Sequence, residues 1–335
     1  MFEIVRTQPG DNNFSSFENF PKEIYLEDSI VFKVPESMNY EYLEAGYLLI
    51  LNGKVQCRAA LYNNPHLQYR QKKACSIGNY ESVDDQGLSA GLLTHIASEA
   101  KNLGAEYLIG PMNGSTWDAY RFSTHHGHPH FFLELYHHLY YKDHFSNSGF
   151  AVIASYYSSI QTDLKFNSPA VVRREQQLKQ AGVKFRNINL NEYENELEKV
   201  FAFNALGFKS NFMYTPISKD DFMRKYAQTK RFIDPQFVVL AEDPGGNLIG
   251  YFFCIRDFFN QASKALIAKT VARHPDKKWS GIGYVLGNII CGRALADGYQ
   301  SIIHALMYDE GTSGNMSKNF SGNSYKNYVL FGKEL

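Results

Sequence analysis

The sequence has few cysteines, and they are widely spaced. The four in its 335 residues are Cys57, Cys75, Cys254 and Cys291, and no two of them form a CxxC pair. Three lie in apolar segments typical of strands or helices, so buried, reduced thiols are expected. This pattern excludes a disulfide framework and fits a reducing compartment.

The sequence also lacks long apolar runs and any excess of charge. The longest apolar runs, such as 47–51, are far too short to cross a bilayer. Residues 1–6 have neither the basic region nor the apolar core of a signal peptide. Lys and Arg number 34, as do Asp and Glu. Zero net charge argues against nucleic acid or an anionic membrane as the main partner, and a cytoplasmic protein is expected.

What the chain does contain is a succession of strand and helix patterns in two halves. A length of 335 residues predicts two domains of about 150 residues each. In the first half, strands are predicted at 1–6, 47–51, 55–62, 74–80, 107–112 and 150–157. An amphipathic helix is predicted over 88–100, capped by Asp84 or Asp85 and ended by Gly104.

The second half repeats this order after a polar, helix-prone linker at 161–181. Strands are predicted at 183–190, 237–241, 248–255, 265–272, 300–307 and 327–331, and helices at 192–208 and 284–297. The hairpin glycines Gly53 and Gly246 are 193 residues apart, and the helix-ending glycines Gly104 and Gly298 are 194 apart. Two nearly equal offsets indicate a duplication.

The predicted fold is therefore α/β (α+β) with two tandem domains, 1–160 and 182–335. Each domain is expected to have a mixed, mostly antiparallel, twisted sheet flanked by helices.

The loop before the second-half helix has the features of an anion site. It joins a strand to a helix and contains Lys277, Lys278, Gly281 and Gly283. The first amides of a helix have no partner within the helix, and the helix dipole favours a negative charge there. The glycines allow the backbone to approach a ligand closely. A phosphate or pyrophosphate site is predicted.

The corresponding loop of the first half has the opposite charge. Residues 81–87 include Glu81, Asp84 and Asp85, with one glycine. Like-charge repulsion at contact range amounts to a few kcal/mol, so a pyrophosphate is expected to bind in the second half alone.

With this order of elements and this loop, the chain resembles the GNAT acyltransferase superfamily in a tandem arrangement. The cofactor motif of that family, Q/R-x-x-G-x-G/A, is matched by 278–283, with Lys278 in the first place. A strand followed by His-Pro before the loop is present as 271–275. The usual N-x-x-A-x-x-x-Y segment is not kept, and Asn315 with Ser317 is its nearest match.

The resemblance implies acetyl-CoA, or another acyl-CoA, as the cofactor. Its pyrophosphate would bind the loop amides, and its pantetheine would pair with the fourth strand of the second half. The cofactor-binding residues implied are Thr270, Val271, Ala272, Lys277, Lys278, Trp279, Ser280, Gly281, Ile282, Gly283, Tyr284, Asn315 and Ser317.

Acyl transfer to an amine needs a base, an oxyanion donor and an acid. In similar enzymes a strand N–H supplies the oxyanion contact, which makes Val271 the candidate. Many members place a glutamate base on the fourth strand, but 265–272 contains none. A water-relayed base, or one from the other half, would then be required. Asp257 and Glu310 are candidates, or ordinary surface carboxylates. For the acid that reprotonates the thiolate, Tyr308 and Tyr325 are candidates, or structural tyrosines.

The acceptor-binding side is predicted in the first half, where the strand at 107–112 ends. Residues 110–121 combine hydrogen-bonding and aromatic side chains that suit a small-molecule pocket. Asn113, Trp117, Tyr120 and Arg121 are the substrate candidates. The alternative is a capped turn in which Trp117 and Tyr120 fill the domain interface.

Seven histidines fall within 20 residues: His125, His126, His128, His130, His137, His138 and His144. Their spacing matches no metal motif and no cysteine is near, so no metal is expected. The aromatic residues between them indicate a covering loop and a short helix that line a cleft.

The leading hypothesis is an acyl-CoA-dependent N-acyltransferase, acting on a small amine at the interface of the two domains. It is expected to work as a monomer or homodimer, without nucleic acid or membrane. One alternative is a non-catalytic tandem module that binds CoA or another ligand. A second is transfer from aminoacyl-tRNA, against which the zero net charge and the intact loop both count.

Overall fold

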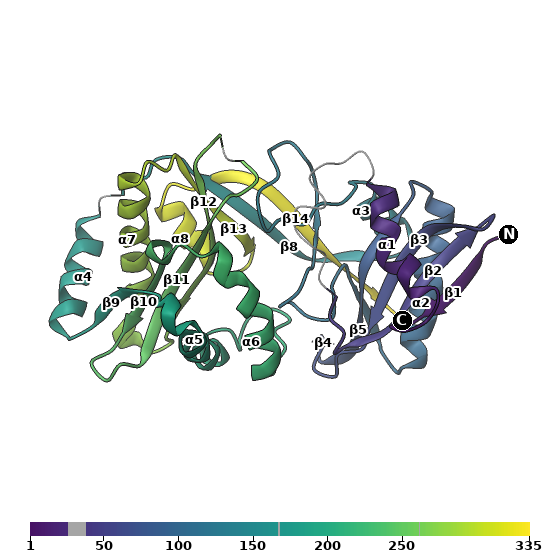
Figure 1. The fold of residues 1–335 in the computed structure, drawn as a ribbon, viewed down its shortest axis with the longest axis horizontal. Helices are drawn as coiled ribbons and strands as arrows, with labels where there is room; N and C mark the ends of the chain where they lie inside the picture. Colours follow the sequence, from purple (N-terminus) through teal and green to yellow (C-terminus); the bar gives the residue numbers. More distant parts are fainter. Residues whose placement is uncertain (26–37, 167, 261) are drawn as a thin grey trace.

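The computed structural model describes residues 1–25, 38–166, 168–260 and 262–335. Across these residues a sheet of 14 strands runs the length of the molecule, with helices on its faces (Figure 1). Its main path is β1-β2-β3-β5-β6-β14-β8-β13-β12-β11-β10-β9, with β4 beside β5 and β7 beside β14.

The elements of the first half are β1 (Glu3–Thr7), α1 (Phe14–Ile24), β2 (Leu43–Leu51), β3 (Lys54–Tyr62), β4 (Gln68–Tyr69), β5 (Lys72–Ser82), α2 (Gln86–Asn102), β6 (Tyr107–Gly110), β7 (Phe122–Ser123), α3 (Tyr141–Asn147) and β8 (Ala151–Gln161). The second half contains α4 (Pro169–Gln180), β9 (Lys184–Asn187), η2 (Leu190–Glu192), α5 (Tyr193–Gly207), α6 (Lys219–Ala227), η3 (Gln228–Phe232), η4 (Pro235–Phe237), β10 (Val238–Glu242), β11 (Leu248–Arg256), β12 (Ala265–Arg273), η5 (Lys277–Trp279), α7 (Ile282–Ala296), β13 (Ser301–Tyr308), α8 (Ser313–Asn319) and β14 (Asn323–Glu334).

The two halves repeat the same topology, as the glycine spacing predicts. In each half four strands pair antiparallel, and the last of them then pairs parallel with a fifth, β5 with β6 and β12 with β13. All four marker glycines have positive φ, from 73° to 80°. The predicted fold class, two mixed and mostly antiparallel sheets flanked by helices, is confirmed.

The final strands of the two halves are exchanged. β8 pairs antiparallel with β13 of the second half, while the C-terminal β14 pairs with β6 of the first half. The two exchanged strands also pair with each other and cross the middle of the molecule (Figure 1). The two half-sheets therefore form one continuous sheet. The domain boundaries at residues 160 and 182 remain predictions from the sequence.

Each half has a core between its sheet and one long helix. In the first half, Leu92, Leu93 and Ile96 of α2 are fully buried against the strands. In the second half, the corresponding helix is α7, with Val285 and Ile290 fully buried. None of the helices in the described part of the chain combines the length and hydropathy that a bilayer crossing needs.

One segment differs from the pattern expected from sequence, and the helix-prone linker also contains a helix. Residues 11–20 are largely polar and rich in residues that favour turns, but α1 begins at Phe14 and buries Phe14, Phe17 and Phe20 on one side. Three phenylalanines at a spacing of three were the helical signal. The linker predicted at 161–181 contains α4, which packs against α7 through contacts that include Leu178.

Candidate active site

The loop between β12 and α7 presents three backbone amides without an acceptor among the described residues. Asp276 caps the short η5, since its Oδ1 accepts from the Lys278 N–H at 2.9 Å. Gly281 has φ +83° and stands at the N-cap of α7 with no side-chain cap. The N–H groups of Gly281, Ile282 and Gly283 consequently start the helix unpaired, which is the arrangement that binds anions.

The side chains of this loop divide into anchors and exposed cations. Trp279 and Ile282 are buried in the second-half core and anchor the loop to it. Lys277, Lys278 and Ser280 are exposed. Lys278 lies over the Trp279 ring, with its Nζ 4.9 Å from the ring centroid. Two lysines thus add positive charge beside the free amides.

Arg174 of α4 also contacts the loop, although no pattern in the sequence marks this residue. Its Nε donates to the Ser280 carbonyl at 2.9 Å, and its Nη2 donates to the Lys278 carbonyl at 2.5 Å. These contacts fix the orientation of two loop peptides. The guanidinium also adds a third positive charge next to the α7 N-terminus.

In the first half, the equivalent helix start is occupied by the protein itself. The Asp85 carboxylate accepts from the N–H groups of Gly87 and Leu88, at 2.8 and 3.0 Å. The cap predicted at Asp84 or Asp85 is Asp85. A carboxylate that already takes these amides leaves no place for a pyrophosphate.

The second-half strands diverge beside the loop. β12 and β13 pair in parallel only as far as Ala268 with His304, and then separate. From Thr270 to Arg273, β12 pairs on its other side with β11 alone. A Cβ added to Gly283 would lie 3.6 Å from Val271 Cγ2, so the loop directly adjoins this β12/β13 splay. Thr270, Val271 and Ala272, which are predicted to pair with pantetheine, form the β12 edge of this splay.

The first-half splay is filled by the chain that follows β6. β5 and β6 pair as far as Ser76 with Ile109. Beyond this point the Met112 N–H donates to the Ile77 carbonyl at 2.8 Å, and Asn113 Oδ1 accepts from the Asn79 N–H at 2.9 Å. Asn113 is buried. Its own N–H donates to the Ala119 carbonyl at 2.9 Å, so Asn113 lies beside the segment that carries Tyr120, but its side-chain amide is used inside the first half.

α8 lies beside the second-half splay and positions a histidine there. Ser317 Oγ is 2.7 Å from His304 Nδ1. Burial lowers the pKa of His304 to about 4, which keeps the imidazole neutral. Sequence analysis missed His304, because one histidine in an apolar strand gives no signal. Asn315 is exposed, and the Tyr284 hydroxyl accepts from Asn319 Nδ2 at 2.8 Å.

The two predicted general acids lie in different places. Tyr308 ends β13 beyond the splay and donates to Glu310 Oε2 at 2.9 Å. Burial and the neighbouring Glu310 raise its pKa to about 12, so the hydroxyl stays protonated at neutral pH. Tyr325 lies instead under the histidine-rich segment, where it donates to the Pro129 carbonyl at 3.3 Å.

Neither alternative base has a free carboxylate at the splay. Asp257 is buried and accepts from the N–H groups of Phe132 and Phe259, at 2.9 and 3.1 Å. Glu310 accepts from Tyr308. Asp257 thus binds the backbone of the histidine-rich segment, and Glu310 is hydrogen-bonded to Tyr308.

The segment 110–121 reaches the second half through Trp117 and Arg121. Trp117 Nε1 donates to the Thr215 carbonyl at 2.8 Å, and its ring meets Phe222 of α6 edge-on. This matches the interface role considered for Trp117. Arg121 Nη1 donates to the Leu306 carbonyl of β13 at 3.1 Å.

Tyr120, Arg121 and Tyr308 come together around Tyr156 of β8. The Arg121 guanidinium lies 3.7 Å from the Tyr120 ring centroid and 4.5 Å from that of Tyr156. The Tyr156 and Tyr308 ring centroids are 5.4 Å apart. Residues from both halves therefore form a wall next to the end of β13.

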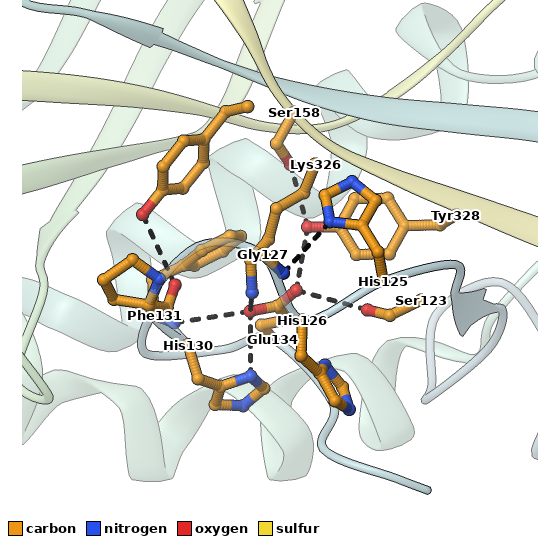
Figure 2. A network of polar contacts seen from close by, with 12 residues as sticks. Ser123, His125, His126, Gly127, His130, Phe131, Glu134, Ser158, Lys326 and Tyr328 are labelled. Carbon is orange, nitrogen blue, oxygen red and sulfur yellow. Dashed lines mark hydrogen bonds and ion pairs between the residues drawn. The ribbon is translucent and has the colours of Figure 1, made fainter. Parts of the chain in front are cut away.

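The histidine-rich segment is held by a buried carboxylate (Figure 2). Glu134 Oε2 lies 2.8 Å from His130 Nδ1 and 2.7 Å from Lys326 Nζ, and Oε1 accepts from the Tyr328 hydroxyl at 3.0 Å. Burial opposes ionisation of Glu134, but His130 and Lys326 outweigh it and lower its pKa to about 2. Lys326 and Tyr328 belong to the exchanged β14, so the network fastens the segment to that strand.

The segment has the covering loop and short helix expected from sequence, with α3 at its end. His137 is buried, and its pKa is lowered to about 4 by burial. In the described part of the chain, no three His, Cys, Asp or Glu side chains are grouped so that they could hold a metal ion.

No sequence model of a protein family matches the chain, and no curated protein matches it. Solved structures do share its fold. A tandem GNAT protein from the clavulanic acid biosynthesis pathway has a TM-score of 0.57 at 11% identity, over 100% of this chain and 98% of that one. A GCN5-related N-acetyltransferase from Sphaerobacter thermophilus has a TM-score of 0.51 at 13% identity, over 99% and 95%.

The chain has the tandem GNAT fold. A further match is a GCN5-related glucosamine N-acetyltransferase region of a fungal multi-domain GH3 β-N-acetylglucosaminidase, with a TM-score of 0.57 at 13% identity. There the match covers 99% of this chain and 38% of the fungal one. The tandem GNAT fold expected from the motif at 278–283 is therefore confirmed.

The two GNAT-like halves of this chain differ in one respect that bears on function. Among the described residues, the first amides of α7 and the β13-facing edge of Thr270–Ala272 have no hydrogen-bond partner in the second half. In the first half, Asp85 takes the helix amides and Asn113 fills the splay.

Proposed function

We propose that the chain is an acyl-CoA-dependent N-acyltransferase that binds one acyl-CoA in its second half. The observation that carries the proposal is the contrast between the halves. Asp85 and Asn113 close both cofactor positions in the first half, whereas the second half leaves three helix amides and one strand edge without partners among the described residues.

The residues present fit the cofactor by their chemistry. The amides of Gly281, Ile282 and Gly283, with Lys277 and Lys278, would hold the pyrophosphate. The free edge of Thr270–Ala272 would pair with the amides of pantetheine, and the Val271 N–H is the proposed oxyanion donor. Bound acetyl-CoA would supply an activated thioester carbonyl.

The acceptor amine is proposed to enter where the two halves meet, near Tyr120, Arg121 and Tyr308. Tyr308 is the proposed proton donor to the leaving thiolate, because its hydroxyl is kept protonated and lies past the splay. When the thiolate has taken the Tyr308 proton, solvent water would reprotonate the phenolate, because Tyr308 lies beside the exposed Glu310. Water is the proposed carrier of the amine proton, since Asp257 and Glu310 are engaged elsewhere.

A second candidate is a CoA-binding module without catalysis. The lack of a carboxylate on β12 favours it, because no side chain of Ala265–Arg273 can serve as a carboxylate base.

Calorimetry with acetyl-CoA, longer acyl-CoAs and CoA tests both candidates. Micromolar-range binding of one molecule per chain is expected. Release of the CoA thiol over a panel of amines then separates them, because the transferase requires turnover and the module does not. If no acyl-CoA and no CoA produces heat, both are rejected.

A further inference from the structure

Two cations, Lys269 and Arg121, lie at the mouth of the β12/β13 splay. Lys269 is on β12, immediately after its last pair with β13, and Arg121 comes from the first half. Within the described residues, neither forms an ion pair with a carboxylate. Paired cations without an anion near a ligand position indicate that the ligand brings the negative charge.

Lys269 is placed there by an irregularity in the strand. Cys254 pairs with Ala268 and Phe253 with Thr270, so Lys269 is an extra residue in β12. Such a bulge re-aims a side chain and is frequent beside functional sites. No hydrogen bond of the Lys269 ammonium to another described residue is formed. The ammonium at this bulge is close enough to Arg121 and Lys225 for their charges to act on it.

The surroundings of Lys269 are positive. Solvent reaches the side chain, yet burial and the charges of Arg121 and Lys225 lower its pKa to about 8. Lys225 of α6 is ion-paired with Asp118, so its charge is already matched. Of these three cations, Lys269 and Arg121 are the two that no carboxylate of the described residues matches.

Arg121 is held so that part of its guanidinium stays available. Its Nε donates to the Tyr120 carbonyl and its Nη1 to the Leu306 carbonyl, both at 3.1 Å. The rings of Tyr120 and Tyr156 lie against its plane. Its Nη2 has no acceptor among the described residues. A guanidinium fixed in this way is pre-organised to bind a carboxylate.

We propose that Lys269 and Arg121 form a binding site for a carboxylate carried by one of the two substrates. The inference rests on the proposed transferase function. The carboxylate belongs either to the acceptor, as in an amino acid, or to the acyl group, as in succinyl-CoA. Both sources place the anion beside the thioester carbonyl, because Lys269 directly precedes the strand edge proposed for pantetheine.

Two comparisons of kcat/KM on the intact chain separate the sources. The first uses acetyl-CoA with amino acids and with the amines that remain when their carboxylate is removed. The second uses one amine without a carboxylate and compares succinyl-CoA with butyryl-CoA, which has the same number of acyl carbons. A preference of at least about tenfold for the carboxylate is expected in one of the two comparisons.

Lys269→Met is expected to abolish that preference by raising the KM of the carboxylated substrate. The kcat/KM of the uncharged substrate should stay within about twofold of the wild-type value. Lys269→Arg should keep most of the preference. Lys184→Met, which changes an exposed strand lysine far from the splay, should change neither value.

Equal use of carboxylated and uncharged substrates in both comparisons would overturn the proposal, as would a preference that survives in Lys269→Met. The wild-type comparison needs no variant to fold. Failure of the transferase function itself would be seen separately, as no release of the CoA thiol with any amine or acyl-CoA, whether or not acyl-CoA binding produces heat, and it would reject this inference as well.

Discussion

A carboxylate placed at Gly283 should prevent acyl-CoA binding by its charge and not by its size. A Cβ at this position would lie 3.6 Å from Val271 Cγ2 and 3.7 Å from Met316 Sδ, which are ordinary contacts. Gly283→Asp therefore puts a negative charge between the loop and the splay. Gly283→Asn adds nearly the same volume without the charge and is the matched control.

The magnitude follows from the geometry of the loop. The side chain of residue 283 would begin within the first turn of α7, where the pyrophosphate is proposed to bind. Two unit charges about 5 Å apart repel by about 3 kcal/mol at an effective dielectric constant of about 20. Since about 1.4 kcal/mol corresponds to a factor of ten, Asp should weaken binding about 100-fold relative to Asn.

Isothermal calorimetry with acetyl-CoA, together with thermal unfolding, measures this difference. An acidic residue in the first turn of a helix is favourable by about 0.3–1 kcal/mol, so the Asp variant should unfold at or above the temperature of the Asn variant. Loss of affinity without loss of stability is the expected signature. Asp and Asn variants that bind acetyl-CoA within about threefold of each other would refute the assignment of the pyrophosphate to this loop.

Three further perturbations test the surroundings of the site. Arg174→Met removes both hydrogen bonds to the loop carbonyls and should weaken acetyl-CoA binding by about 1–2 kcal/mol, as measured by calorimetry; the exposed neighbour Arg173→Met is the control, and an equal effect of both would contradict a specific role for Arg174. Asp85→Ala removes the α2 cap and should lower the free energy of unfolding in urea by about 1 kcal/mol. It should not create a second acetyl-CoA site, because Asn113 still fills the first-half splay; a stoichiometry of two would show otherwise. The pKa of Glu134 is about 2 in the folded protein, below its ordinary value of 4.5, so its stabilising effect is complete above pH 4.5 and is lost as the pH falls toward 2. Unfolding followed over this range should show a loss on the order of 3 kcal/mol that Glu134→Gln lacks and the exposed Glu23→Gln keeps; equal acid sensitivity of the two variants would mean that the buried network is not its source.

Much of the fold followed from local patterns in the sequence. The hairpin at Asn52–Gly53, the cap at Asp85 and the loop at 278–283 were predictable because each depends on residues that are close in the chain. The duplication was visible because two markers recur at nearly equal offsets. α1 could have been found from Phe14, Phe17 and Phe20, whose spacing is helical.

The site was predictable only in part, because its components come from distant segments. Arg174 reaches the loop from a helix about a hundred residues earlier, and nothing in its local sequence marks it. Asn113 looked like a pocket residue by composition, but its amide is used to fill the first-half splay. Lys269 looked like an ordinary strand lysine, and the bulge that re-aims it depends on pairing with β11.

The sequence by itself determined that there are two similar halves and that the second carries the loop suited to an anion, because these properties reside in residue identity and spacing. The tertiary structure alone decided that β8 and β14 are exchanged, since the partner of a strand's edge is not encoded in its own alternation of side chains. That exchange makes the sheet continuous. It brings Tyr156 and Arg121 of one half beside Tyr308 and Lys269 of the other, where the acceptor is proposed to bind.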